Sequence, residues 1–307
     1  MKAALITDYG NDIEVTDVDR PSLPADSVML EVHAAAINPV DWIVMEGHMK
    51  GMLDYDLPWI VGYDVAGVVT EVGAAASKFS VGDKVFARAD GMQAGTMAEF
   101  CAVKESDLAI QANNATHQQS AGIPLAGLTA WQALYDHGSL ETGQRVLIHA
   151  GSGGVGTLAI QFAKHTGAFV ATTASAENRE LVTNLGADQF VDYSDEKFED
   201  VVEPCDLVFD MLGGDTLERS FDVVKQGGRV VSIKGEAPDG LAEAKGVTFE
   251  QFFMSPNGEQ LAEIAALIEA GTVTPIVDSE FPLDDVAKAY EHARSGEANG
   301  KVIVTMR

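Results

Sequence analysis

Cysteine is scarce in this chain, and long apolar runs are missing. The 307 residues contain two cysteines, Cys101 and Cys205, too few for a disulfide framework or a four-thiolate zinc lobe. We interpret both as small apolar packing residues. No stretch reaches the roughly 18 to 20 apolar residues of a membrane-spanning helix, and the apolar start at residues 1–6 is too short for a signal sequence. We therefore expect a cytoplasmic protein with no membrane partner.

Positive charge is equally scarce. The chain has 20 Lys and Arg residues against 47 Asp and Glu residues, which gives a formal net charge of -27. A surface of this charge repels nucleic acids and anionic membranes, so neither is expected as a partner. If the protein binds an anionic ligand, we expect its few basic residues and its helix N-termini to be concentrated at that site.

The most informative stretch is Arg145-Val-Leu-Ile-His-Ala-Gly-Ser-Gly-Gly-Val-Gly156. An apolar run typical of a buried parallel strand leads into glycines spaced G-x-G-x-x-G, after which apolar residues recur at helical spacing. In a dinucleotide cradle such glycines permit the tight turn, the approach of the pyrophosphate and the packing of helix on strand. The alternative is a glycine-rich surface turn, but the flanking strand and helix favour the cradle. Its candidate binding residues are Gly151, Ser152, Gly153, Gly154, Val155 and Gly156.

Two kinds of strand pattern divide the chain, whose length and 46% apolar content suit two domains. Before residue 115, strand-like runs separated by turn signals predict a β-rich barrel or sandwich. These runs lie at residues 3–6, 28–32, 65–72 and 84–87. From residue 145 onward strands and helices alternate, which predicts an α/β domain with a doubly wound parallel sheet. Its strands are expected at residues 146–148, 169–173, 189–192, 207–210 and 229–233.

Several helices are expected beside these strands. Residues 126–134 have helical apolar spacing and lead toward the glycine turn. Asp215 is a candidate N-cap for a helix through Val224, which Gly227-Gly228 would end. Asn257 is a candidate N-cap for the next helix.

The pattern changes again after Gly271. Residues 273–281 look extended, residues 283–294 helical, and residues 301–305 form a last strand. We expect this tail to return to the first domain. The predicted domains are therefore residues 1–118 with 273–307, and residues 119–272. Residues 236–247 remain unassigned.

Six separate motifs together resemble the medium-chain dehydrogenase/reductase superfamily, in particular its zinc-independent quinone oxidoreductase branch, which includes zeta-crystallin. The resemblance covers essentially the whole chain. It implies a catalytic domain with a GroES-like fold, a Rossmann domain, and a cofactor cleft between the two. The motifs are Ala36-Ile-Asn-Pro-Val-Asp41, Val61-Gly-Tyr-Asp-Val-Ala-Gly67, Pro124-Leu-Ala-Gly-Leu-Thr-Ala130, Ala150-Gly-Ser-Gly-Gly-Val-Gly156, Leu185-Gly-Ala-Asp188 and Gly300-Lys301.

The residues that hold zinc in metal-dependent relatives are replaced here. Asn38 stands in the place of the first Cys, and Tyr63-Asp64 in the place of a His-Glu pair. Catalytic zinc needs three protein ligands, drawn mainly from His and Cys, and asparagine and tyrosine are poor substitutes. The histidines show no pair at metal-ligand spacing. We therefore predict neither a catalytic nor a structural zinc.

The end of the second predicted parallel strand favours NADPH over NADH. An enzyme that selects NAD usually places an acid there to bind the ribose 2'-hydroxyl, and this chain has none at the strand end. Ser175 can donate a hydrogen bond, and Arg179 carries a forked cation suited to a phosphate. In similar reductases this segment and the tyrosine at Tyr193 hold the 2'-phosphate. The alternative for Arg179 is an exposed helix charge, and Glu177 weakens the argument.

The resemblance also implies which residues lie at the nicotinamide end of the cofactor. They come from the helix near residue 129, from loops after the fourth and fifth parallel strands, and from the last strand. They are Thr129, Leu212, Gly213, Ser232, Ile233 and Lys301.

The missing metal indicates the chemistry. Without a Lewis acid, reduction of a plain ketone or aldehyde loses transition-state stabilisation, whereas quinones and α,β-unsaturated carbonyls are already electron-poor. For them, a well-placed hydride donor and hydrogen-bond donors to the developing enolate suffice. We expect Asn38 and Tyr63 to be those donors, with Asp41 and Asp64 as braces. The sequence predicts an NADPH-dependent reductase of a quinone or enone.

Two alternatives to this prediction stay open. The first is a metal-free enone or acryloyl reductase for which quinones are incidental acceptors, and the second is a weakly catalytic NADPH-binding sensor or structural protein. A strand near residues 247–254 at the edge of the parallel sheet could pair across a two-fold axis. Similar proteins form homodimers in this way, so a homodimer is expected.

Overall fold

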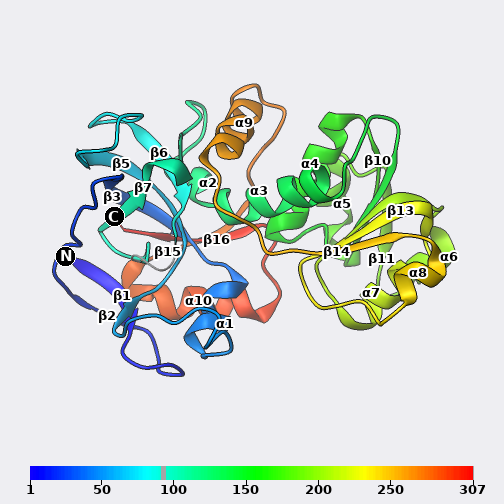
Figure 1. Ribbon diagram of the computed structural model, residues 1–307, viewed down its shortest axis with the longest axis horizontal. Coiled ribbons are helices and arrows are strands. Elements are labelled where there is room, and N and C mark those ends of the chain that lie inside the picture. The colour runs from blue at the N-terminus through cyan, green and yellow to red at the C-terminus, as the bar shows by residue number, and fades with distance from the viewer. Residues whose placement is uncertain (91–94, 307) are drawn as a thin grey trace. The chain divides into compact units, whose positions relative to one another are not determined.

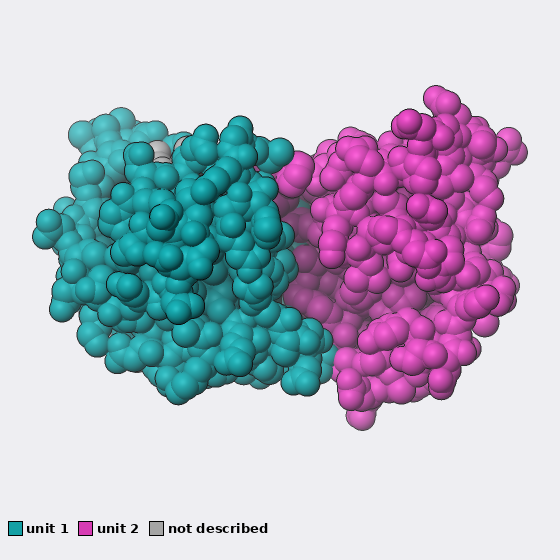
Figure 2. All heavy atoms as spheres, turned by 90° about the horizontal axis from the view of Figure 1, so that it is seen from below, with its two compact units in different colours: residues 1–128, 256–307 teal, residues 129–255 magenta. Residues whose placement is uncertain are grey.

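The computed structural model describes residues 1–90 and 95–306. It divides into two compact units, residues 1–128 with 256–307 (unit 1) and residues 129–255 (unit 2) (Figure 1). Figure 2 shows the atoms of each unit in its own colour. Among the described residues, no helix is both long and apolar enough to cross a bilayer.

Unit 1 is built mainly of antiparallel strands. One sheet has the order β2-β1-β4; the other has the order β15-β16-β3-β5-β6-β8, and β7 also pairs with β3. Their bounds are β1 Lys2–Ile6, β2 Glu14–Asp17, β3 Ser27–Ala36, β4 Trp59–Ile60, β5 Asp64–Val72, β6 Lys84–Arg88, β7 Phe100–Lys104, β8 Leu108–Ile110, β15 Val277–Pro282 and β16 Lys301–Thr305. The helices are α1 Pro39–Met45, α2 His117–Ala121, α3 Pro124–Trp131, which runs into unit 2, α9 Gly258–Glu269 and α10 Val286–Ser295, with 3-10 turns at Glu105–Asp107 and Leu283–Asp285.

The core of unit 1 follows from alternating apolar residues on these strands. In β3, β5 and β6 they bury a mainly aliphatic cluster that includes Leu30 and Val69. A second cluster holds aromatic side chains, among them Trp59 and Tyr290, between β1, β16 and helices α1 and α10. The last strand, β16, pairs with β3 near the start of the chain, which confirms the expected return of the tail.

Unit 2 contains a six-stranded sheet in the order β11-β10-β9-β12-β13-β14, and every neighbouring pair is parallel. This confirms the predicted parallel sheet. The strands are β9 Arg145–Ile148, β10 Phe169–Ala174, β11 Gln189–Asp192, β12 Cys205–Asp210, β13 Val224–Ser232 and β14 Thr248–Gln251. The helices are α4 Gly154–Thr166, α5 Arg179–Asn184, α6 Phe198–Val201, α7 Gly214–Ser220 and α8 Leu241–Lys245, with a π-helix at Gln132–His137 and a 3-10 turn at Ala176–Asn178.

One helix prediction was wrong. α7 ends at Ser220, so it does not run through Val224, and the residue before its first turn is Gly213 rather than Asp215. The glycine pair Gly227-Gly228 lies within β13. The reason is packing, because a Cβ on Gly228 would lie 2.8 Å from the backbone oxygen of Asp206 in β12. Gly228 permits a close strand approach rather than a helix end.

The compact units differ from the predicted domain boundaries at residues 119–128 and 256–272, which cluster with unit 1. Asn257 caps α9 as expected, since its Oδ1 accepts the N–H groups of Glu259 and Gln260 at 3.0 Å. The helix lies against β8, and a Cβ on Gly258 would come within 2.4 Å of the Leu108 carbonyl oxygen. This contact is long-range in sequence, so the apolar period could not reveal it.

Candidate active site

The glycine turn lies between the carboxyl end of β9 and the start of α4. A Cβ on Gly151 would lie 2.0 Å from Thr172 Oγ1, and one on Gly156 would lie 2.3 Å from the Ala150 carbonyl oxygen, so packing demands glycine at both positions. A Cβ on Gly153 would meet nothing nearer than 3.4 Å. The protein itself does not require that glycine, whereas a pyrophosphate approaching the backbone does. The turn therefore fits a dinucleotide.

The other predicted residues of the turn lie where anion-binding N–H groups are expected. Gly153 is the N-cap of the 13-residue α4, and no side chain caps it. Gly154 and Val155 open the helix, and Ser152 precedes the cap. The first N–H groups of a helix have no intrahelical acceptor, and the helix dipole favours negative charge there.

Asn178, which the sequence analysis missed, connects this turn to the segment predicted to bind the 2'-phosphate. Its Nδ2 donates to Ser152 Oγ at 3.3 Å and to Ser175 Oγ at 3.0 Å. Ser175 in turn donates to Glu177 Oε1 at 3.2 Å. An asparagine in a polar run has no distinctive spacing, so no sequence signal marked it.

Arg179 and Tyr193 lie exposed beside this segment. The Arg179 guanidinium stacks 4.2 Å from the centre of the Phe190 ring. Within residues 1–90 and 95–306 it contacts no carboxylate, which leaves its forked N–H groups open to an anion. Tyr193 is 64% exposed, and its N–H donates to the Ala174 carbonyl at the end of β10.

Asp210 organises the loops after β12 and β13, and it too was missed. Its fully buried carboxylate accepts the N–H groups of Leu212 at 3.1 Å and Gly213 at 3.0 Å, and the hydroxyl of Ser232 at 2.7 Å. Its backbone oxygen accepts the N–H of Ile233 at 3.2 Å. Burial raises the pKa of Asp210, and these hydrogen bonds oppose the rise. A carboxylate closing an apolar strand was the available signal.

Thr129 and Lys301 complete the set predicted for the nicotinamide end. Thr129 lies in α3 with 3% of its surface exposed. Lys301 lies in unit 1, at the first position of β16, where it joins a buried polar network.

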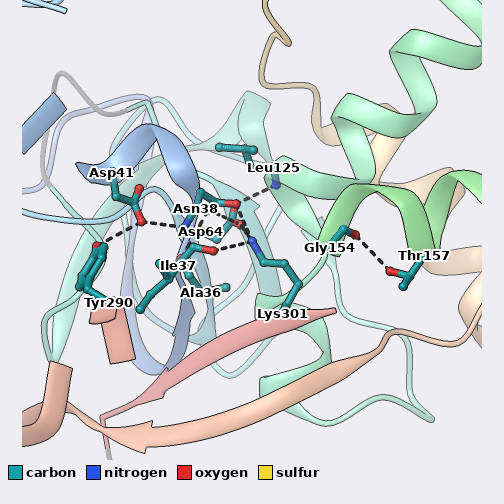
Figure 3. A network of polar contacts seen from close by, with 10 residues as sticks. All are labelled: Ala36, Ile37, Asn38, Asp41, Asp64, Leu125, Gly154, Thr157, Tyr290 and Lys301. Atoms are coloured by element: carbon teal, nitrogen blue, oxygen red, sulfur yellow. Dashed lines mark hydrogen bonds and ion pairs between the residues drawn. The ribbon is translucent and has the colours of Figure 1, made fainter. Parts of the chain in front are cut away.

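Figure 3 shows this network around Asn38, Asp64 and Lys301. The Lys301 ammonium donates to Asn38 Oδ1 at 2.5 Å and lies 3.7 Å from Asp64 Oδ2. It also donates to the Ile37 carbonyl oxygen at 2.8 Å. Asp64 Oδ1 accepts the N–H of Leu125 in α3 at 2.8 Å. Residues from the first quarter of the chain and from its last strand thus form one buried ion pair.

Burial and charge act in opposite directions on this ion pair. Burial lowers the pKa of Lys301, while Asp64 and Asp41 raise it. Burial likewise raises the pKa of Asp64, opposed by Lys301 and Asn38. An unpaired charge at either position would carry a large desolvation cost, so each residue depends on the other.

Asp41 forms a second buried carboxylate beside this pair. Its Oδ2 accepts the backbone N–H of Asn38 at 2.8 Å and the hydroxyl of Tyr290 at 3.1 Å, whereas its buried Oδ1 has no hydrogen-bond partner. Burial raises the pKa of Asp41 to about 7, although the Asn38 hydrogen bond and Lys301 lower it. Asp41 therefore fixes the N-cap residue of α1 through a hydrogen bond. Its pKa lies near neutral pH.

The two predicted donors, Asn38 and Tyr63, are both buried at 1% exposure. Asn38 Nδ2 donates to Asp64 Oδ2 at 2.8 Å and faces the Ala36 carbonyl oxygen at 3.4 Å. The Tyr63 hydroxyl pairs with that of Tyr55 at 2.6 Å, and burial keeps it protonated by raising its pKa. To donate to a substrate, Asn38 Nδ2 would have to leave the Ala36 carbonyl oxygen, or the Tyr63 hydroxyl would have to leave Tyr55. The role of these two residues as donors therefore stays a prediction.

The donor set does not fit zinc. The oxygen atoms of Asn38 and Asp64 that could face a metal already face the ammonium of Lys301, which is itself a cation. Asn38 also lacks the anionic or imidazole character that zinc prefers. In the described part of the chain, no three His, Cys, Asp or Glu side chains are grouped to hold a metal ion.

The antiparallel unit and the parallel unit with its glycine turn define an oxidoreductase of the medium-chain dehydrogenase/reductase class. Comparison with known families agrees with this class. Residues 24–114 match the family described as "Alcohol dehydrogenase GroES-like domain", and residues 185–304 match that described as "Zinc-binding dehydrogenase".

Individual relatives narrow the assignment. The chain is 39% identical to the "NADPH-dependent alkenal/one oxidoreductase, chloroplastic" of Arabidopsis thaliana, over 99% of this chain and 79% of that protein. It is 31% identical to the quinone oxidoreductase of Coxiella burnetii, with a TM-score of 0.91 over 100% of this chain and 99% of that one. A mycobacterial structure complexed with NADPH is 28% identical, with a TM-score of 0.88 over 99% of both chains. The chain belongs to the medium-chain dehydrogenase/reductase superfamily, in its quinone oxidoreductase branch.

Proposed function

We propose that this enzyme transfers hydride from NADPH to a quinone or an α,β-unsaturated carbonyl compound without a metal ion. The observation that carries the proposal is the Asn38–Asp64–Lys301 network, in which a buried ammonium contacts Asn38 and Asp64, the residues that the family resemblance sets at zinc-ligand positions. The glycine turn, with its open side at Gly153, supports a dinucleotide as the hydride source. The names of the Arabidopsis and Coxiella relatives agree with this reaction.

The residues of unit 1 supply charge and a proton. NADPH, when bound, provides a hydride from its nicotinamide ring. As the acceptor carbon gains the hydride, negative charge develops on the acceptor oxygen, and one proton completes the reduction. The Lys301 ammonium favours that negative charge, and Tyr63 is the candidate proton donor, since burial keeps its hydroxyl protonated. Asn38 positions Lys301 and is the second candidate donor.

Ser175, Arg179 and Tyr193 are the proposed contacts of the 2'-phosphate. Arg179 stands free of carboxylates among the described residues, which supports a preference for NADPH. We expect Arg179→Ala to weaken NADPH binding about 3- to 10-fold and to leave NADH binding unchanged. Fluorescence titration with both nucleotides measures this. Equal losses for the two nucleotides would show that Arg179 does not read the 2'-phosphate.

The acceptor class is tested by steady-state NADPH oxidation with quinones, alkenals, enones and simple aldehydes. The name of the 39% identical relative favours enones and alkenals as acceptors. We expect turnover of electron-poor acceptors and none of simple aldehydes. Efficient aldehyde reduction would refute the metal-free mechanism. NADPH binding without oxidation of the nucleotide by any acceptor would favour a sensor or structural role.

Two further properties are proposed. β14 ends the strand order of the parallel sheet and pairs only with β13 among the described strands, which supports pairing of its outer edge with a second copy across a two-fold axis. We propose a homodimer, which light scattering would detect as twice the chain mass. We also propose a cytoplasmic location, which cell fractionation tests.

A further inference from the structure

His149 is a buried histidine that the proposed chemistry does not use. It lies between the last residue of β9 and the glycine turn, with 1% of its surface exposed. Its ring meets the edge of the Phe198 ring at 4.7 Å between centroids. Both ring nitrogens face hydroxyl groups, Nδ1 that of Thr173 and Nε2 that of Ser220.

The proton positions around this ring follow from counting donors. The Ser220 hydroxyl has one hydrogen, which it donates to the Thr216 carbonyl oxygen at 2.7 Å. Ser220 Oγ can therefore only accept from the ring, so His149 Nε2 carries a hydrogen and donates over 3.0 Å. Burial, and to a smaller extent the charge of Arg219, lowers the pKa of His149 to about 3. At neutral pH the ring is thus neutral, and Nδ1 is an acceptor.

The acceptor nitrogen continues the chain of hydrogen bonds into the glycine turn. Thr173 donates its single hydroxyl hydrogen to His149 Nδ1 at 3.2 Å, so its oxygen is free to accept the backbone N–H of Ala150, also at 3.2 Å. The backbone oxygen of Thr173 accepts the N–H of Gly151 at 2.9 Å. One threonine on β10 thereby holds two successive N–H groups at the entry to the turn.

Ala150 needs such support, because it has a φ of 52° in the left-handed region. Residues with a Cβ adopt this region at a cost, and they persist there when the surroundings fix them. The ordered chain runs from Ala150 N–H through Thr173 and His149 to Ser220 and Thr216 of α7. α7 follows directly on the Asp210 loop that holds Leu212 and Gly213.

We propose that His149 is a positioning residue that links α7 to the glycine turn and thereby sets the affinity for the dinucleotide. The proposal rests on the proposed function, since it assumes that NADPH occupies this turn. His149 acts through Thr173 and the Ala150 backbone rather than by touching the nucleotide. Loss of either hydroxyl partner breaks the chain while the glycine fingerprint stays intact.

The test compares Thr173→Val, which deletes the hydroxyl and keeps the β-branched shape, with Thr173→Ser, which keeps the hydroxyl. We expect Thr173→Val to raise the Kd for NADPH and the KM for NADPH about 3- to 10-fold, with the KM for the quinone unchanged. Thr173→Ser should restore the wild-type values. His165→Gln, an exposed histidine at the end of α4, is the control and should change neither constant. Equal affinity of wild type and Thr173→Val would overturn the proposal.

A spectroscopic measurement on the wild-type protein tests the proton order directly. Nitrogen-15 NMR of the histidine rings, assigned by loss of a signal in His149→Gln, should show a neutral Nε2–H ring between pH 5 and pH 8, as the pKa of about 3 requires. An Nδ1–H ring, or titration of His149 in this range, would contradict the chain. Absence of NADPH binding by the wild-type protein would instead refute the proposed function.

Discussion

The glycine turn of unit 2 and the Asn38–Asp64–Lys301 network of unit 1 are built in opposite ways. The turn is contiguous in sequence, and its fit to a ligand depends on backbone and missing side chains. The network joins side chains that lie 263 residues apart, and it depends on charge. A site of the first kind tolerates little added volume, whereas a site of the second kind tolerates little change in charge.

Removing the ammonium of Lys301 should have the largest effect. In Lys301→Met the buried Asp64 loses its countercharge, which we expect to lower the free energy of unfolding by about 3 to 5 kcal/mol and to abolish turnover. Urea unfolding and steady-state kinetics measure the two effects. Lys288→Met, at an exposed ion pair, is the control and should cost under about 1 kcal/mol. A loss no greater than that of the control would show that Asp64 does not depend on the Lys301 ammonium.

Alanine substitutions at Gly151 and Gly153 should distinguish a glycine required for packing from one required for nucleotide binding. Gly151→Ala should destabilise the protein, because its Cβ would overlap Thr172. Gly153→Ala has room within the protein and should lower the free energy of unfolding by only about 1 kcal/mol, the cost of alanine at an N-cap, yet weaken NADPH binding at least about tenfold. Thermal unfolding and nucleotide titration measure both. Full affinity in Gly153→Ala would mean that no pyrophosphate approaches this residue.

Asp41 should make the stability of the protein fall as pH rises. Its folded pKa of about 7 exceeds the ordinary aspartate value of 3.8, so between these values the native state binds a proton that the unfolded state lacks. The contribution is complete below the unfolded pKa and is lost as pH rises through about 7, at up to about 1.4 kcal/mol per pH unit.

Replacing Asp41 isolates this contribution. Asp41→Asn should lose less stability than wild type between pH 5 and pH 8, measured by urea unfolding at each pH. The charged neighbours Asp64 and Lys301 remain in both proteins, as do Tyr63 and Tyr290. Asp284→Asn, at an exposed carboxylate, is the control and should keep the wild-type slope. Parallel slopes for Asp41→Asn and wild type would contradict the raised pKa.

Tyr63→Phe should have the smallest effect. We expect turnover to fall several-fold, because solvent can replace the proton donor, while NADPH affinity stays unchanged. Tyr55→Phe is the matched variant, since it removes the hydrogen-bond partner but keeps the Tyr63 hydroxyl. Unchanged turnover in Tyr63→Phe would mean that this hydroxyl plays no part in the reaction.

The sequence predicts the elements of this fold where the signal is local. The parallel strands, the tail strand and the Asn257 cap all follow from short-range patterns, and the structure contains them. Gly227-Gly228 was misassigned because a glycine pair ends helices and also lets strands approach.

In the candidate site, too, only the features with a local sequence signal were predictable. The glycine turn is a local fingerprint, but Asn178 and Asp210 act through tertiary hydrogen bonds that no spacing encodes. The contact of Lys301 with Asn38 depends on the pairing of β16 with β3, which brings together residues far apart in the sequence. Resemblance to relatives named these residues, but it did not predict that they bond to each other.

The split of unit 1 along the chain bears on the order of synthesis. Unit 2 is one continuous stretch, so the ribosome releases all of it before β16 has been made. Lys301 is added only after all of unit 2, and until then Asp64 has no ammonium beside it. During synthesis, unit 2 with its glycine turn can therefore fold before Lys301 and Asp64 form their ion pair.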